Sequence, residues 1–454
     1  MGIFSAMTTA VTGLRAQSFA LDNISGNIAN AQTIGFKRND TTFADLVADD
    51  GAAPTQRSGS VRALTQSTNG VAGGIQSSDI ATNMSINGNG YFVLAQKTGS
   101  ANGNPIFSTE SLYTRRGDFS LDKDGYLVNG AGYYLKAQPI DQTTGEPTSS
   151  TPVPIQFSND LLPAKATTTI NYRANLPQFP LTANADTSIP GSDLLPNGGM
   201  TGAITISPGV SADDQTVFLQ NSIAGGSVTT YDPNGNPVNL QMRWGKTAES
   251  ATGGTWNLFY LSDSAATGTS QMWTNVGTDY VFDASGKLSP AIASTTLTGL
   301  TVNGTTVGDV SLNFGTAGLT QYADTNGATQ VNALNQDGYA AGQAISVSVS
   351  DGGHIVANYS NGQTLEVGRV MLAGFNGEDS LQKLDGGAFA ETLDSGPPIL
   401  GTTGKVSGSS LEASNTDIAT EFSKLIVTQQ AYSANTRIVT TADQMMQEVM
   451  NMKR

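Results

Sequence analysis

Apolar side chains recur in steps of three and four residues at both ends of the chain. The N-terminal series begins at Phe4 and the C-terminal series at Ile418. This spacing keeps one face of a helix against a partner helix. We therefore predict that the two terminal helices pair with each other and also contact neighbouring copies of the chain. The predicted assembly interface consists of Met7, Val11, Leu14, Leu21, Ile28, Ile418, Phe422, Leu425, Tyr432, Val439 and Met446.

The rest of the N-terminal helix surface carries almost no charge. Arg15 and Asp22 are the only charged side chains among residues 1–30, whereas a solvated helix face is usually rich in charged residues. A helix with this many Thr, Asn and Ser residues is marginal in water on its own. The pattern favours a helix that is enclosed by other protein and ordered by assembly. An ordinary amphipathic helix on a globular core is the alternative.

Between the helices, short alternating runs separated by turn residues predict β structure. Asp124-Gly125, which lies between two apolar runs, is a typical hairpin signal. The expected fold class is mainly β with α-helical termini, in which the terminal helices pair as a coiled-coil-like layer and β-rich outer domains are nested between them. We expect paired helices at 1–31 and 411–454, an extended connector at 32–78, a discontinuous β domain at 79–136 and 337–400, and an inserted outer β domain of one or two parts at 137–336.

Residues with catalytic or metal-binding potential are few. The chain has no cysteine, and its one histidine, His354, stands in a predicted turn. Asp122 and Asp124 lack the further acidic ligands of a calcium loop. No glycine-rich nucleotide loop is present. We therefore expect no enzyme activity, no cofactor and no metal, although an enzyme that uses only carboxylates stays open.

The charge balance excludes some partner classes. A net charge of -15 argues against a nucleic-acid partner and against docking on an anionic membrane surface. No apolar run is long enough for a membrane-spanning helix, so no membrane insertion is expected. The first 30 residues lack the basic and apolar regions of a cleaved secretory signal.

Motifs in both helices resemble those of the bacterial flagellar rod and hook protein family. The first motif ends in Asn27-Ile28-Ala29-Asn30, then Thr33 and Gly35-Phe36-Lys37; Gly26 stands where many members have Asn. The second motif runs from Ser414-Asn415-Thr416-Asp417-Ile418 through Gln429-Gln430-Ala431-Tyr432-Ser433-Ala434-Asn435 to Thr441-Ala442-Asp443-Gln444-Met445-Met446. Ile86-Asn87-Gly88-Asn89-Gly90-Tyr91-Phe92 and Tyr113-Thr114-Arg115-Arg116-Gly117-Asp118-Phe119 are similar to the family's shared β region.

The resemblance implies a structural subunit with its terminal helices in the inner layer of a tube. The large middle block favours the hook branch, whose members form a curved flexible tube that acts as a universal joint between the motor rod and the filament. The implied partners are further copies of the chain, a rod protein at the proximal end, a hook–filament junction protein and a hook cap at the distal end, and the flagellar type III export apparatus. The implied location is the flagellum outside the cell, reached without a cleaved signal peptide. The alternatives are a straight rod or junction protein of the same family and a secreted β-rich adhesin.

Overall fold

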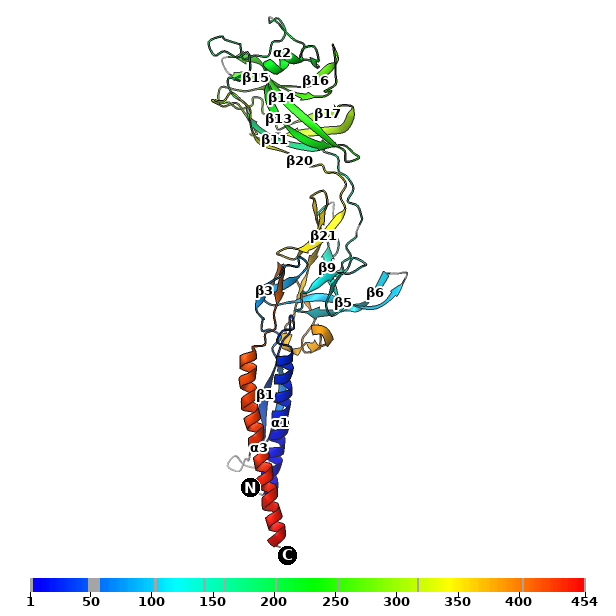
Figure 1. Cartoon of the computed structure of the whole chain (residues 1–454), viewed down its shortest axis with the longest axis vertical. Coiled ribbons are helices and arrows are strands. Elements are labelled where there is room, and N and C mark those ends of the chain that lie inside the picture. Colours follow the sequence, from blue (N-terminus) through cyan, green and yellow to red (C-terminus); the bar gives the residue numbers. More distant parts are fainter. Residues whose placement is uncertain are drawn as a thin grey trace. The chain divides into compact units, whose positions relative to one another are not determined.

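The chain folds into two compact units. The computed structural model describes residues 3–47, 58–101, 104–141, 144–158, 160–200, 202–250, 253–316, 318–401 and 404–452. The terminal unit comprises Met1–Asn159, Ile345–Asn358 and Thr364–Arg454, and the inserted unit comprises Asp160–Ala344 and Tyr359–Gln363 (Figure 1). Most elements of both units are strands, which confirms a mainly β fold with helical termini. None of the described helices is long and apolar enough to cross a membrane.

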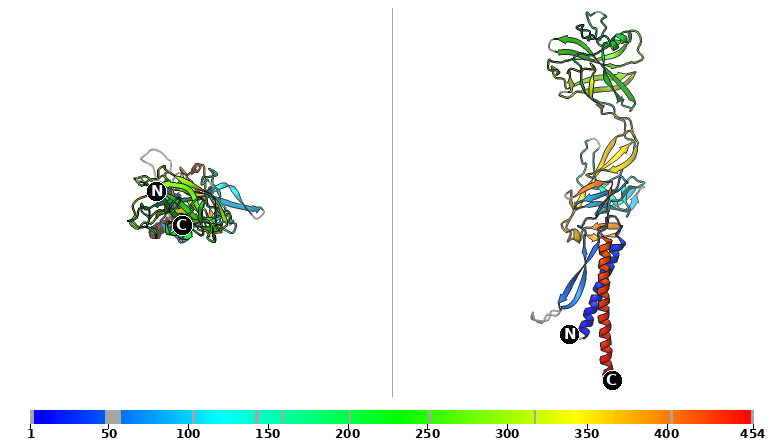
Figure 2. Two further views of the ribbon diagram at one scale, coloured as in Figure 1. Left: turned by 90° about the horizontal axis from the view of Figure 1, so that it is seen from above. Right: turned by 60° about the vertical axis from the view of Figure 1, so that its left-hand side comes forward.

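The terminal helices α1 (Ile3–Ala29) and α3 (Ile418–Met452) lie side by side and antiparallel (Figures 1 and 2). Helix α3 begins directly after Asp417, whose carboxylate accepts a hydrogen bond from the backbone N–H of Thr420 at 2.7 Å. This bond satisfies one of the free donors in the first turn and lowers the pKa of Asp417.

The stretch expected as an irregular connector, 32–78, instead contains a hairpin. Strands β1 (Asn39–Val47) and β2 (Ser58–Ser67) pair antiparallel, and the ribbon packs along α1 (Figure 2). Phe43 is 48% exposed and Leu64 is 41% exposed. Because most side chains on both faces of this ribbon remain in contact with solvent, the sequence lacks the sharp alternation of a half-buried strand. The Asp49-Asp50-Gly51 stretch lies outside the described residues.

The large sheet of the terminal unit combines strands from distant parts of the chain. Its main path is β21 (Ala344–Val349), β22 (His354–Tyr359), β23 (Thr364–Val370), β9 (Tyr134–Pro139), β5 (Tyr91–Ala101), β6 (Asn104–Thr114), β26 (Ala388–Ala390) and β25 (Gln382–Lys383). Shorter strands β7 (Phe119–Leu121), β8 (Leu127–Asn129), β10 (Val153–Pro154), β24 (Leu372–Gly374) and β27 (Ile399–Leu400) pair beside it. The single-turn helices η2 (Glu378–Ser380) and η3 (Asp385–Gly387) complete this region.

Two small sheets connect the large sheet to the helices. Strand β4 (Met84–Asn87) pairs with β28 (Lys405–Gly408), and β3 (Ile75–Ser77) pairs with β29 (Ser410–Glu412). The expected domain limits therefore shift at three places. The limit at 137 falls inside β9, and the inserted unit extends beyond 336 to Ala344. The C-terminal helix starts at Ile418 rather than at 411, because the chain up to Glu412 is part of β29.

The inserted unit is a two-sheet sandwich. One sheet contains β17 (Ser294–Val302), β18 (Thr305–Asn313), β11 (Thr169–Asn175), β19 (Leu319–Thr320) and β20 (Gln330–Gln336). The other contains β12 (Gly209–Ser211), β16 (Gln271–Val281), β15 (Gly253–Leu261), β14 (Pro237–Ser250) and β13 (Ile223–Tyr231), with helix α2 (Gln215–Gln220) beside β12. Residues of both sheets share one core, in which Tyr172, Trp244, Trp256, Tyr280 and Phe314 are almost fully buried. Core aromatics of this kind anchor a sandwich.

Gly117 sits where no side chain fits. A Cβ at this position would lie 1.7 Å from the backbone oxygen of Met84, whose N–H donates to the Gly117 oxygen at 3.0 Å. Backbone cannot move aside cheaply, so Gly117→Ala should lower the free energy of unfolding of the terminal unit by about 1–3 kcal/mol. Gly99→Ala is the control because no atom lies within 4 Å of its Cβ position. Denaturant unfolding would measure both, and equal stabilities would contradict the expectation.

Candidate assembly site at the terminal helices

The seam between α1 and α3 is made of small and polar residues. The buried positions of α1 are Ala10, Gly13, Ala16, Ala20, Ile24 and Asn27, and those of α3 are Glu421, Thr428 and Ala442. A Cβ on Gly13 would lie 2.9 Å from the Asn435 side-chain nitrogen. Such small side chains allow the two helix axes to approach closely. The helices therefore pair through a narrow seam, which leaves the larger apolar side chains of α1 outside it.

On α1 the predicted assembly residues lie one position along from the seam residues, about 100° around the helix. On α3, in contrast, Leu425, Val439 and Met446 lie three or four positions from the buried residues and therefore share the seam face. Met7, Val11, Leu14, Leu21 and Ile28 are half-buried on α1. On α3, Leu425, Val439 and Met446 are half-buried, while exposed fractions reach 44% for Ile418, 50% for Phe422 and 41% for Tyr432. The structure thus places the α1 stripe beside the seam and part of the α3 stripe on the seam face, and it leaves both stripes only partly buried. The α1 side of the seam was not predicted from the sequence, although its small residues repeat with helical spacing.

Helix α3 also exposes apolar side chains outside the predicted stripe. The exposed positions are Ile426, Val427, Ile438, Met445 and Val449. A helix that packs on a single partner carries one apolar stripe, and exposed apolar surface of this extent is typical of interaction sites. Helix α3 therefore carries more apolar surface than its pairing with α1 covers.

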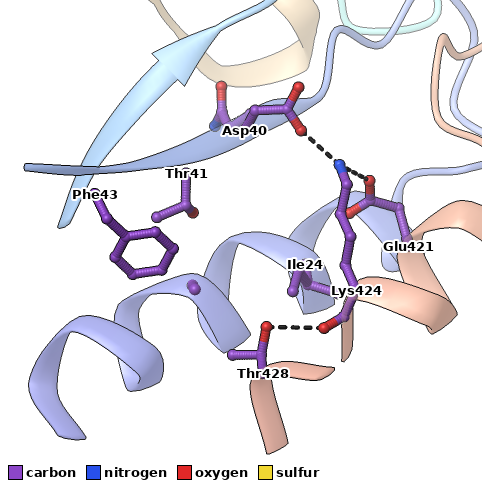
Figure 3. A pocket seen from close by; sticks show the side chains of 9 residues that line it. Ile24, Asp40, Thr41, Phe43, Glu421, Lys424 and Thr428 are labelled. Carbon is purple, nitrogen blue, oxygen red and sulfur yellow. Dashed lines mark hydrogen bonds and ion pairs between the residues drawn. The ribbon is translucent and has the colours of Figure 1, made fainter. Parts of the chain in front are cut away.

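A polar network joins the two helices to the hairpin. Asn27 donates from its side chain to Glu421 at 3.0 Å and to the Asn39 backbone oxygen at 2.8 Å, and it accepts from the Asn39 N–H at 2.9 Å. Lys424 bridges Glu421 at 2.8 Å and Asp40 at 2.7 Å (Figure 3). This arrangement explains why the first motif contains Asn at position 27.

A groove of about 420 Å³ opens beside this network. Figure 3 shows side chains from α1, β1 and α3 around it, including Ile24, Phe43 and Thr428. The Phe43 ring is half exposed, so the groove combines an apolar wall with the Lys424 ion pairs. These features suit a protein segment better than a small charged ligand.

Glu412 is the centre of a buried ionic hub at the base of the helices. Its Oε1 lies 2.5 Å from Lys37 Nζ and accepts from the Gly73 N–H at 2.9 Å, and its Oε2 lies 3.3 Å from Arg115 Nη1. The Lys37, Arg115 and Glu412 side chains are fully buried. Burial lowers the pKa of Lys37, and the Glu412 charge opposes that shift. The hub joins the end of the helix motif to the Tyr113–Phe119 motif.

Lys383 makes a pH-dependent contribution to the stability of the same region. Its Nζ donates to the Lys37 backbone oxygen at 2.7 Å and to Asn39 Oδ1 at 2.5 Å. Burial lowers the pKa of Lys383 to about 8, from an ordinary value of 10.5, against the opposing charge of Asp379. Between these two pH values the unfolded chain binds the proton and the folded chain does not. Its contribution to the free energy of unfolding should therefore rise with pH across this window.

Lys383→Met should remove that rise. Denaturant unfolding at several pH values between about 8 and 10.5 would measure it. Lys97→Met, at an exposed position of β5, is the control and should keep the pH dependence of the unsubstituted chain. An unchanged slope in the Lys383 variant would contradict the assignment.

Asp122 and His354 were considered for metal or catalytic chemistry, and both make contacts that stabilise the local fold. Asp122 accepts backbone hydrogen bonds from Asp124 and Tyr126, which closes a hairpin turn. His354 Nδ1 lies 2.5 Å from Glu366 Oε1 on the adjacent strand. Across the part of the chain that the structure describes, no group of three or more His, Cys, Asp or Glu residues could hold a metal ion.

Comparison with known proteins gives one consistent family. Four family models match: "Flagella basal body rod protein" at 7–37, "Flagellar hook protein FlgE/F/G D1 domain" at 85–171, "Flagellar basal body protein FlaE D2 domain" at 219–339, and "Flagellar basal body rod FlgEFG protein C-terminal" at 407–452.

Full-length relatives carry the same family name. The flagellar hook protein FlgE of Escherichia coli is 31% identical, and that of Salmonella typhimurium is 30% identical; each comparison covers 99% of this chain and 100% of the relative. A crystal structure of Helicobacter pylori flagellar hook protein FlgE2 is 17% identical with a TM-score of 0.49, covering 74% of this chain and 100% of that chain.

Proposed function

Because the chain belongs to the flagellar hook protein family, we propose that it acts as a structural subunit whose copies assemble through α1 and α3 into the bacterial hook. Its place is the flagellum, in the hook and basal-body region. The full-length match to hook proteins favours this role over a straight rod or junction protein and over an adhesin.

One observation carries the assembly proposal. On α1 the stripe of large apolar residues lies beside the intramolecular seam and is only half-buried, and on α3 the stripe stays exposed at Phe422 and Tyr432. Burying such side chains is worth about 1.5–3 kcal/mol each. A helix pair cannot cover these side chains with its own small-residue seam, so neighbouring copies complete the burial. Assembly and the final packing of the helices are then coupled.

The mechanical role follows from the contrast between the two units. The helices present apolar surface for permanent contacts, whereas Asp160–Ala344 of the inserted unit is rich in Thr, Ser and Asn. Polar contacts exchange with water at small net cost, so copies of the inserted unit slide past one another while the helical layer holds. This combination suits a curved tube that bends as a universal joint. End partners are a rod protein on one side and junction and cap proteins on the other, and the chain reaches them through the flagellar export apparatus.

Negative-stain electron microscopy of the purified protein, concentrated and seeded with hook fragments, would test the proposal. Curved or supercoiled tubes are expected. Straight tubes would instead indicate a rod-like polymer and contradict the universal-joint role. Persistent monomers under seeding would contradict assembly through the helices.

A further inference from the structure

A second buried ion pair lies in the inserted unit. Lys246 on β14 has its Nζ 2.6 Å from Oδ2 of Asp193, and both side chains are 1% exposed. The two residues are 53 positions apart. Lys246 Nζ also donates to the Gln178 backbone oxygen at 2.8 Å and lies 3.3 Å from Glu249 Oε1.

The backbone holds the two side chains together. The Leu195 N–H donates to the Lys246 backbone oxygen at 2.6 Å, and the Asn197 side chain donates to the Thr247 oxygen at 3.2 Å. The loop that carries Asp193 is therefore fixed along β14. Reacting groups held in this way gain a large effective concentration.

The residues around the ion pair exclude water and leave one oxygen of the Asp193 carboxylate without a hydrogen-bond donor. Trp256 is fully buried opposite Lys246 on β15. Neither Asp193 Oδ1 nor Trp256 Nε1 has a hydrogen-bond partner, although both atoms are buried. A buried ion pair without full hydrogen bonding pays a desolvation cost that its attraction does not fully repay.

The carboxylate of Glu412 in the ionic hub has more hydrogen-bond donors than the carboxylate of Asp193. There, Lys37 lies at a similar distance from its carboxylate partner, but that carboxylate also receives the Gly73 N–H and Arg115. These donors stabilise the negative charge. Asp193 Oδ1 has no such donor, so the negative charge of this carboxylate is compensated by Lys246 at Oδ2 and not by further donors at Oδ1.

We propose that Lys246 and Asp193 condense into an isopeptide bond. A proton passes from the Lys246 ammonium to the Asp193 carboxylate, which gives a neutral amine and a carboxylic acid. The Nζ lone pair attacks Cγ of Asp193, the N–C bond forms, the C–O bond breaks, and one water molecule leaves with the transferred protons. The reaction needs no oxidant, reductant or cofactor.

Glu249 serves the reaction as a proton carrier. Its carboxylate touches Lys246 Nζ and is 52% exposed, so it can pass protons between the buried nitrogen and solvent. The product is a covalent cross-link in a chain that has no cysteine. Like a disulfide, it restricts the unfolded chain, and a reducing environment does not break it.

Intact-mass spectrometry of the full chain tests the proposal directly. The expected mass is lower than the sequence mass by one water molecule, and protease digestion should release a branched peptide that contains Lys246 and Asp193. A wild-type mass equal to the sequence value would overturn the proposal, and this readout requires no variant to fold.

Matched variants locate the bond. Lys246→Arg should restore the full sequence mass, whereas Lys165→Arg should keep the deficit, because Lys165 forms a partly exposed ion pair with Asp337. A deficit that persists in the Lys246 variant would overturn the assignment. In a time course of intact mass on freshly synthesised chain, Glu249→Gln should slow the appearance of the deficit, and an unchanged rate would overturn the proton-carrier role.

Discussion

Replacing Glu412 by alanine should lower the free energy of unfolding of the terminal unit by about 3–5 kcal/mol. The substitution leaves the Lys37 ammonium and the Arg115 guanidinium fully buried without their shared carboxylate. It also removes the acceptor of the Gly73 N–H. An uncompensated buried charge is costly because the interior cannot replace its hydration. Differential scanning calorimetry and urea unfolding would both report the change.

The matched control is Asp124→Ala, which removes the carboxylate of an ion pair at the surface. Lys123, its partner, is 85% exposed, and exposed pairs contribute only about 0–1 kcal/mol. If Glu412→Ala and Asp124→Ala destabilised the protein equally, the hub would have no special role. Double replacement of Lys37 by Met and Glu412 by Leu should recover part of the loss, since no lysine charge would then remain buried.

The substitution Phe422→Asp should raise the critical concentration for polymer formation by roughly 100-fold. Phe422 is half exposed in the single chain, so the change should leave the monomer folded. In the proposed polymer, the new carboxylate is buried against a neighbouring copy at a cost of about 3 kcal/mol. Sedimentation of seeded polymer over a range of protein concentrations would measure the effect.

Ser423→Asp adds the same charge at the next position of α3, about 100° around the helix, and is the control. Its critical concentration should change much less than that of the Phe422 variant. Circular dichroism of both monomers should match the unsubstituted chain. Normal polymers from the Phe422 variant would remove this part of α3 from the interface.

The sequence predicted the fold class and the existence of both helices, because their apolar repeats are long and the motifs are specific. It failed to show which face of α1 closes the intramolecular pair. Ala10, Gly13 and Ala16 carry little hydrophobic signal, so a small-residue seam is outweighed by the larger side chains at Val11 and Leu14.

The sequence also did not reveal the ionic hub or the hairpin. Lys37, Arg115 and Glu412 are far apart in the chain, and single charged residues are usually solvated. These segments are brought together by the pairing of β29 with β3 and of β28 with β4, and by a hydrogen bond from the Gly35 N–H to the Glu412 backbone oxygen. Strand β1 was missed because its side chains remain largely exposed and show no buried alternation.

The contacts at the base of the helices join the two ends of the chain. Lys37 meets Glu412 across 375 positions, and Asn27 meets Glu421 across 394 positions. A chain that ends early through truncation or cleavage lacks both carboxylates and the whole of α3. Its Lys37 and Arg115 then have no carboxylate partner, and the seam on α1 stays open. Both contacts require the chain as far as Glu421, so a subunit that ends earlier lacks the helix pair on which the proposed assembly depends.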